Sequence, residues 1–217
     1  MHADLLTRLR ASLSPEPLPE VRADELGVAP EIIETLKRRF DPGLLRPAAV
    51  LVPVLAGGAE PRVLLTERAS HLPQHPGQIS FPGGRCEERD CGDAVATALR
   101  ETQEEIGLDP AEVEVLGYLP AYPTFTGYRI TPVLGWIGRP VQFLPDPREV
   151  SSLLEVPMQH ALDPRNYRLH MVEREGFTLP AYELRHGAQR IWGATAAMLH
   201  ELSRRYAGGV ARRADTA

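Results

Sequence analysis

The amino-acid sequence predicts an α/β protein, an α/β/α sandwich in which helices cover both faces of a mixed β-sheet. Apolar runs of strand length recur between residues 48 and 192, and two main helices are expected, one over 94–106 and one that starts in the stretch 192–195 and runs to about 206. Strands that alternate with helices are typical of such layered folds. With 217 residues, of which 43% are hydrophobic, the chain is long enough for one well-packed domain with appendages.

The chain divides into three parts: an N-terminal helical arm over 1–44, a folded domain over 45–207 and a flexible C-terminal tail over 208–217. A proline-rich link in the arm separates a first helix from a second short helix near 31–39. The first helix is indicated by leucines at helical spacing, at Leu5, Leu6, Leu9 and Leu13. Packing against the domain is a commoner purpose for such an arm than a separate function.

Strands are expected in the folded domain wherever a short apolar run is bounded by glycine, proline or polar residues. Gly57 and Gly58 form the turn between the first two strands. An aromatic loop over 122–127 either borders a substrate or packs at the edge of the core. The expected strands are 48–56, 62–67, 113–119, 128–137, 167–172, 177–184 and 190–192.

The helix over 94–106 has the clearest boundaries in the sequence. Asp93 is a suitable N-cap, and Gly107 followed by Pro110 ends the helix. At about 100° of rotation per residue, one narrow stripe is mainly apolar and a neighbouring face is acidic. The acidic face carries Glu101, Glu104 and Glu105.

Three acids on one helix face raise each other's pKa unless cations neutralise them. A divalent-metal site, for Mg²⁺ or Mn²⁺, is therefore a sensible purpose for this face. For an E-x-x-E-E run taken alone, a solvated acidic surface is the commoner interpretation, so that the surrounding sequence must decide.

The stretch from Gly84 to Leu108 resembles the Nudix box, G-x5-E-x7-R-E-U-x-E-E-x-G-U, in which U is apolar. Fifteen residues separate Gly84 from Arg100, where the family normally has thirteen. Asp90 keeps the usual distance from Gly84 and Gly92 keeps the usual distance from Arg100, so the loop acid of the box is left unassigned. The second half of the box is matched by Arg100, Glu101, Thr102, Glu104, Glu105, Gly107 and Leu108, with Thr102 in an apolar position.

This resemblance implies a metal-dependent hydrolase that cleaves a nucleoside diphosphate linked to a second group. It implies Glu101 and Glu105 as the main metal ligands, Glu104 as the third, and Arg100 as the residue that orients a glutamate. Glu149 precedes a further strand and short helix, and is a candidate for another ligand or for the group that activates water.

The segment just before the box, LLTERASHLPQHPGQISFPGG over 64–84, resembles the additional signature of coenzyme A pyrophosphatases, L-L-T-x-R-x-x-x-L-x-x-H-x-G-Q-I-x-F-P-G-G. It implies hydrolysis of coenzyme A to 3′,5′-ADP and 4′-phosphopantetheine. Taken by itself, His75 is equally well explained as a structural histidine. The expected substrate-binding residues are Arg68, His75, Gln78, Ser80, Gly83 and Gly84.

Two other functions stay open from the residues alone. The substrate is another pyrophosphate, such as a nucleotide sugar, a dinucleotide or a nucleoside triphosphate, or the chain is a Nudix-like module that senses a nucleotide without cleaving it. Metal-dependent turnover separates the second possibility from the rest.

The composition indicates which binding partners and which cellular compartment to expect. A formal net charge of −5 argues against binding to a nucleic-acid backbone, so that a small-molecule substrate is expected. The sequence has no apolar run near the roughly 20 residues of a membrane span and no signal-peptide core, which predicts a cytoplasmic protein with no membrane partner. Cys86 and Cys91 are expected to be reduced thiols without a role. Both a monomer and a homodimer fit the sequence.

Overall fold

The computed structural model describes residues 2–20, 45–124, 126–174 and 177–214. The short helix expected near 31–39 lies outside these residues. In the described part of the chain, no helix is both long enough and apolar enough to cross a membrane.

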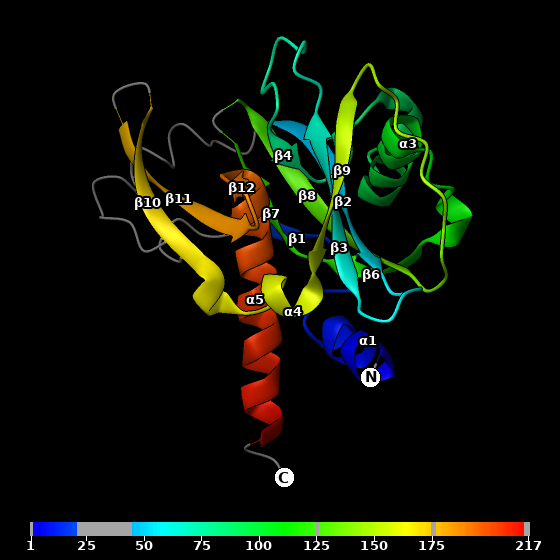
Figure 1. Ribbon diagram of the computed structural model, residues 1–217, viewed down its shortest axis with the longest axis vertical. Helices are drawn as coiled ribbons and strands as arrows, with labels where there is room; N and C mark the ends of the chain where they lie inside the picture. The colour runs from blue at the N-terminus through cyan, green and yellow to red at the C-terminus, as the bar shows by residue number, and fades with distance from the viewer. Residues whose placement is uncertain (1, 21–44, 125, 175–176, 215–217) are drawn as a thin grey trace.

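A mixed sheet forms the centre of the molecule (Figure 1). Its central strand, β2, runs parallel to β8 and antiparallel to β3 and β5. The strands β4 and β9 pair with β3, the strands β6 and β7 pair with β8, and β1 extends the sheet beyond β7. The strands are β1 (Leu18–Glu20), β2 (Arg46–Leu55), β3 (Arg62–Arg68), β4 (Ile79–Ser80), β5 (Gly83–Arg85), β6 (Glu114–Tyr118), β7 (Pro120–Pro123), β8 (Tyr128–Ile137) and β9 (Val150–Pro157).

Helices cover both faces of this sheet, which confirms the predicted α/β/α arrangement (Figure 1). One face packs against α3 (Ala94–Ile106), where Leu51, Ala98 and Ile106 are buried together. The other face packs against α5 (Ala194–Ala214), where Val52 and Leu199 are buried together. Two shorter helices, α1 (His2–Ala11) and α4 (Met158–Ala161), lie beside α5.

Three further strands form a separate sheet that contacts α5. They are β10 (Tyr167–Arg174), β11 (Phe177–His186) and β12 (Gln189–Trp192), joined as two antiparallel pairs. Figure 1 shows β10 and β11 projecting to the side of the main sheet. Single turns of 3₁₀-helix complete the described elements: η2 (Glu88–Asp90), η3 (Pro110–Glu112) and η4 (Pro164–Asn166).

The boundaries predicted for α3 are confirmed. The Asp93 carboxylate accepts hydrogen bonds from the backbone N–H groups of Val95 and Ala96, at 2.8 and 3.4 Å. At the other end, Gly107 adopts a left-handed conformation (φ 69°) and its N–H donates to the carbonyl of Gln103. Both ends of the helix are therefore fixed by its own sequence.

The prediction for the C-terminus was wrong for most of the expected tail. The helix α5 does not end near Tyr206 but continues to Ala214, so that residues 208–214 are helical rather than a flexible tail. The residues after the Gly208-Gly209 pair include alanines and arginines, which are strong helix formers.

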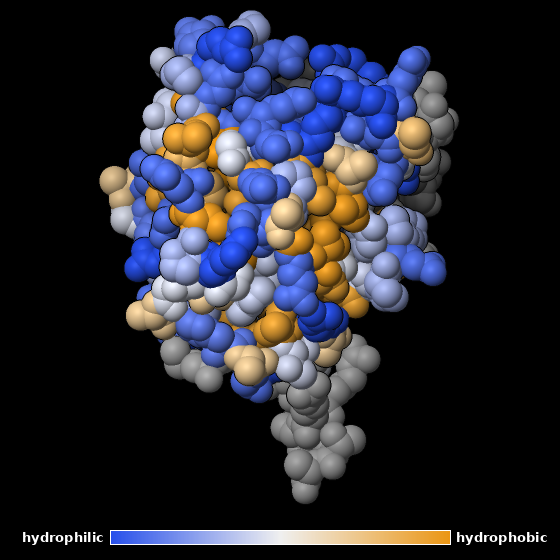
Figure 2. Space-filling model, turned by 90° about the vertical axis from the view of Figure 1, so that its right-hand side faces the viewer, coloured by the Kyte–Doolittle hydropathy of each residue, from blue (hydrophilic) through white to orange (hydrophobic). Residues whose placement is uncertain are grey.

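The surface is largely hydrophilic where Figure 2 shows it, with apolar residues gathered in a central region. Among the described residues, the large apolar side chains that are clearly exposed are Leu144, Leu169 and Met171. Leu169 and Met171 alternate along β10, on the opposite side of that strand from Val172.

Candidate active site

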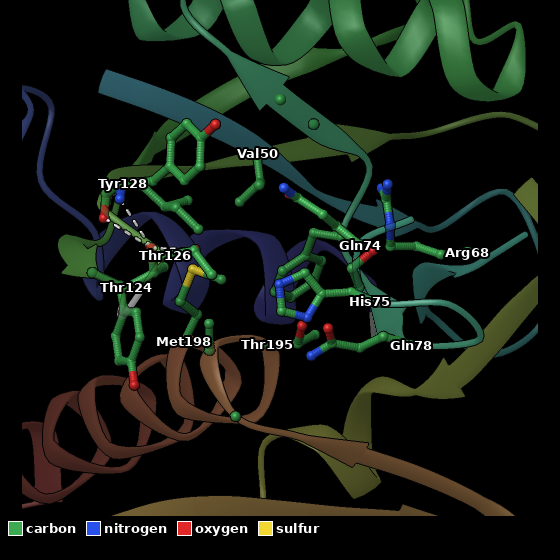
Figure 3. A pocket seen from close by; sticks show the side chains of 18 of the residues that line it. Val50, Arg68, Gln74, His75, Gln78, Thr124, Thr126, Tyr128, Thr195 and Met198 are labelled. Carbon is green, nitrogen blue, oxygen red and sulfur yellow. Dashed lines mark hydrogen bonds between the residues drawn. The ribbon is translucent and has the colours of Figure 1, made fainter. Parts of the chain in front are cut away.

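A cavity of about 760 Å³ lies between the main sheet and the unit formed by α5 and the three-stranded sheet. All the predicted site residues line this cavity except Arg100 and Glu104. They come from α3, from the end of β3, from β4 and β5, and from the segments that precede β4 and β9. Figure 3 shows Arg68, His75 and Gln78 on one side of it and Tyr128 and Thr124 on the other.

Three carboxylates meet at one end of the cavity. Glu105 is only 4% exposed, and burial, followed by the negative charge of Glu149, raises its pKa to about 8. Burial is also the main cause that raises the pKa of Glu101. The backbone N–H of Ala69, next to Arg68 on β3, donates to the Glu149 carbonyl at 2.8 Å and so holds Glu149 beside that strand.

Two glycines bring the backbone of β5 against these acids. A Cβ atom on Gly84 would lie 2.4–2.6 Å from the carboxylate of Glu101, so the carboxylate occupies the space that any other residue would fill. Gly83 has φ 151°, and a Cβ atom there would lie 2.4 Å from the carbonyl oxygen of Ala49. The double glycine of the sequence therefore lets Glu101 approach the strand.

Arg100 lies behind the cavity and holds the loop that precedes α3. Its guanidinium donates to both carboxylate oxygens of Asp90, at 2.9 and 2.8 Å, and to Glu101 at 2.9 Å. The buried Asp90 also accepts from Thr97, and the hydrogen bonds from Arg100 hold its pKa well below the ordinary value. Of the two positions that the lengthened box left open, Asp90 is thus the one whose side chain bonds to Arg100.

Glu104 lies apart from the other two acids of the helix. Its carboxylate accepts hydrogen bonds from Arg100 and from Arg89, each at 3.1 Å, and its side chain is 46% exposed. Because one turn of α3 separates Glu101 from Glu105, those two share a face, whereas Glu104 is rotated towards the loop of Arg89.

Arg68 ends β3 and begins the loop that leads to β4. Its N–H donates to the Gln78 carbonyl at 3.0 Å, and its own carbonyl accepts from Gly77 at 3.1 Å, so that the loop closes on itself. His75 and Gly77 in this loop have positive φ angles of 55° and 67°. Arg68 pairs with Val150 in the register of β3 and β9, which places it next to Glu149, and its positive charge lowers the pKa of Glu105. Its Nε is buried and, within the described residues, has no hydrogen-bond partner.

The donor set fits a hard divalent cation. Buried carboxylates that raise one another's pKa are the groups that such a cation neutralises, and oxygen is the ligand atom that Mg²⁺ and Mn²⁺ prefer. In the described part of the chain, no three His, Cys, Asp or Glu side chains already form a metal-binding group. Mg²⁺ commonly uses one or two carboxylates together with waters and substrate phosphates, so a complete protein cage is not required.

Opposite the main sheet, the described residues that line the cavity have uncharged side chains. This uncharged wall is formed by β10, β11, β12 and the start of α5, and it is held in place by Glu183, whose buried carboxylate accepts from Arg185 and Arg190. These hydrogen bonds lower the pKa of Glu183 to about 2. The residues of this uncharged wall are Val172, Leu179, Pro180, Ala181, Trp192, Gly193, Ala194, Thr195 and Met198.

Several lining residues were missed from the sequence. Arg46 begins β2 and Tyr128 begins β8, and the two are partners in the parallel register, with the guanidinium 4.3 Å from the centre of the ring. Thr195 lines the cavity and donates to the Ile79 carbonyl at 3.2 Å. No local pattern marks these residues, because strand pairing brings Arg46 and Tyr128 together and the packing of α5 brings Thr195 to the cavity. Gln74 lay within the recognised segment, but no position of the signature named it.

Comparison with known proteins matches residues 45–179 to the NUDIX domain. A protein of Pectobacterium atrosepticum named "Uncharacterized Nudix hydrolase NudL" is 39% identical over 158 residues, which cover 73% of this chain and 81% of that protein. A protein of the same name from Yersinia pestis is 38% identical over 158 residues, with 73% and 78% covered.

The chain is also similar to two solved structures. An Ap4A hydrolase from C. elegans, in a binary complex, is 16% identical, with 76% of this chain and 98% of that chain covered and a TM-score of 0.48. A MutT/nudix family protein from Enterococcus faecalis is 17% identical, with 76% and 62% covered and a TM-score of 0.48.

Proposed function

This chain belongs to the Nudix family, and from that premise we propose that it hydrolyses the pyrophosphate bond of coenzyme A to give 3′,5′-ADP and 4′-phosphopantetheine. Hydrolysis of a pyrophosphate compound is the activity of a Nudix hydrolase, and the choice of coenzyme A is the finer part of the proposal. Free, oxidised and acylated coenzyme A are all included in it.

One observation carries the choice of substrate. The segment over 64–84, which resembles the signature of coenzyme A pyrophosphatases, supplies a wall of the same cavity that holds the carboxylates of α3. Arg68, His75 and Gln78 of this segment reach that cavity through a closed loop. If this segment served only to pack the core, its polar side chains would not be expected to line the cavity.

Glu101 and Glu105 would hold the divalent cation, and Arg100 would keep the Glu101 carboxylate in place through its hydrogen bond. The bound cation supplies charge neutralisation on the phosphate oxygens and acidifies water. Arg68 offers donors to a phosphate oxygen beside the carboxylates. In the reaction, a water oxygen bonds to one phosphorus, and the bond from that phosphorus to the bridging oxygen breaks. Glu149 stays a candidate for a further ligand or for the group that takes the proton of the water.

The test is to incubate the protein with coenzyme A and either Mg²⁺ or Mn²⁺, and to identify the products by mass. The same assay with a nucleotide sugar, a dinucleotide and a nucleoside triphosphate gives the ratios of kcat/KM. We expect 3′,5′-ADP and 4′-phosphopantetheine, no turnover with a chelator present, and the highest kcat/KM for coenzyme A.

Two results would contradict the proposal in different ways. A higher kcat/KM for one of the other compounds would mean that the chain is a hydrolase but that coenzyme A is not its preferred substrate. Binding of nucleotides without turnover of any of them, at saturating metal, would make the chain a sensing module.

A further inference from the structure

The cavity holds a second group of positive charges, away from the carboxylates. We propose that Arg46 and Arg85 form an anion subsite, and that this subsite binds a phosphomonoester on the nucleoside half of the substrate. The inference rests on the proposed function, because in coenzyme A this group is the 3′-phosphate. In this proposal, the 3′-phosphate and the pyrophosphate bind at different places in the cavity.

Strand register brings the two arginines together. Ala48 of β2 pairs with Arg85 of β5 in the antiparallel register, and Arg46 lies two residues before Ala48 on the same face of β2. Diagonal neighbours of this kind are about 7–8 Å apart at their Cα atoms, which long side chains span easily. Both arginines line the cavity, and the proposed anion would lie between their guanidinium groups.

Arg46 is held in a defined position. Its guanidinium lies over the ring of Tyr128, 4.3 Å from the ring centre, and one of its nitrogens is 3.5 Å from the carbonyl oxygen of Thr126. The turn that precedes Tyr128 is also held in place, because the Tyr128 N–H donates to the Thr124 hydroxyl at 3.1 Å. A guanidinium stacked on a ring keeps the N–H groups at its edge available for an anion.

In the described part of the chain, no carboxylate pairs with either arginine of this subsite, whereas Arg100 and Arg89 each pair with carboxylates. Glu87 also lines the cavity, but its carboxylate pairs with Arg89 at 2.8 Å. Two unpaired guanidinium groups match the charge and the oxygen geometry of a phosphate dianion.

Arg68 is the third arginine of the cavity, and it serves a different place. Arg68 pairs with Val150 in the register of β3 and β9, so it lies next to Glu149, beside the carboxylates where the pyrophosphate would bind. In Figure 3, Arg68 and Tyr128, which marks the position of Arg46, lie on opposite sides of the cavity. An anion at Arg46 and Arg85 is therefore a second group of the substrate rather than part of the pyrophosphate.

The test measures binding of 3′,5′-ADP and of 5′-AMP by calorimetry, without metal, so that turnover plays no part. Arg46→Gln and Arg85→Gln are each expected to weaken binding of 3′,5′-ADP by about ten-fold or more, and to weaken binding of 5′-AMP at least five times less. Arg62→Gln is the matched control, because Arg62 lies on β3 outside the cavity, with Glu155 3.9 Å away.

The outcomes separate this inference from the proposed function. Equal losses for the two nucleotides, or wild-type affinities that do not differ, overturn the subsite even if coenzyme A is hydrolysed. Selective loss for 3′,5′-ADP supports the subsite even if coenzyme A is not the substrate. If one variant fails to fold, as thermal unfolding will show, the other decides the question.

Discussion

Among single residues, Glu105 is placed most directly for the chemistry, because its carboxyl group is buried beside two other acids and a glycine strand. We predict that Glu105→Gln and Glu101→Gln each lower kcat by at least about 10²-fold, since each removes a charged oxygen ligand and nearly preserves shape. The measurement is kcat for coenzyme A at saturating metal, with thermal unfolding to show that the variants fold.

Glu104 gives an internal comparison for this prediction. Its carboxylate is bonded to Arg100 and Arg89 and lies outside the cavity, so Glu104→Gln is expected to lower kcat less than Glu105→Gln does. Glu155→Gln, on the exposed surface of β9, is the control for loss of a negative charge. Near wild-type turnover in Glu101→Gln or Glu105→Gln would remove that residue from the proposed ligands.

At this scale the sequence located nine of the thirty residues that line the cavity, and all of these except Glu149 belong to two continuous motifs. It placed Glu101 and Glu105 on one face, since residues four apart on a helix point the same way. It did not separate Glu104 from them, because only the positions of Arg89 and Arg100 decide which way that carboxylate turns. Arg46 was missed, because its pairing with Tyr128 spans most of the main sheet's sequence.

Among the elements, α3 depends on its capping residue. We predict that Asp93→Ala lowers the free energy of unfolding by about 1 kcal/mol, because it removes the acceptor for two backbone N–H groups at the start of the helix. Urea unfolding measures the change, and an unaltered slope would show that stability alone has changed.

Asp109→Ala is the matched control for this cap. Asp109 also accepts a backbone hydrogen bond, from Ala111 at 2.9 Å, but it caps only the three residues of η3. Asp109→Ala is expected to lower the free energy of unfolding by less than half as much as Asp93→Ala does. Equal costs would mean that the Asp93 cap contributes no more to stability than an ordinary turn does.

Elements with strong local signals were predicted well, and elements defined by their neighbours were not. The helix α3 has a cap, a stripe and a terminal glycine, and its predicted boundaries match the structure. The strands β1, β4 and β5 have two or three residues each, too few to show a period, and they exist because longer strands pair with them. The strands β10, β11 and β12 were predicted as strands, but nothing local shows that they leave the main sheet.

For the whole molecule, the position of this second sheet decides what faces the carboxylates. Val172 of β10 belongs to the uncharged wall, and we predict that Val172→Asp lowers kcat/KM for coenzyme A by about ten-fold or more. A carboxylate there must lose water against an apolar wall, and it repels the phosphates of the substrate. Steady-state kinetics on coenzyme A measures the effect.

The neighbouring position on the same strand supplies the control. Met171 is 57% exposed and points away from Val172, so Met171→Asp is expected to change kcat/KM by less than about two-fold. Similar kinetics in the two variants would show that the wall does not contact the substrate.

The two walls of the cavity are formed by different segments of the chain, so that each wall can change in evolution independently of the other. Mutations in β10, β11 or β12 alter one wall while α3 and its cap stay untouched. Substitutions in the three-stranded sheet can therefore change which ligand binds, while the carboxylates of α3 are retained. For engineering, a hairpin transplanted from a relative at β10 and β11 is the natural first chimera.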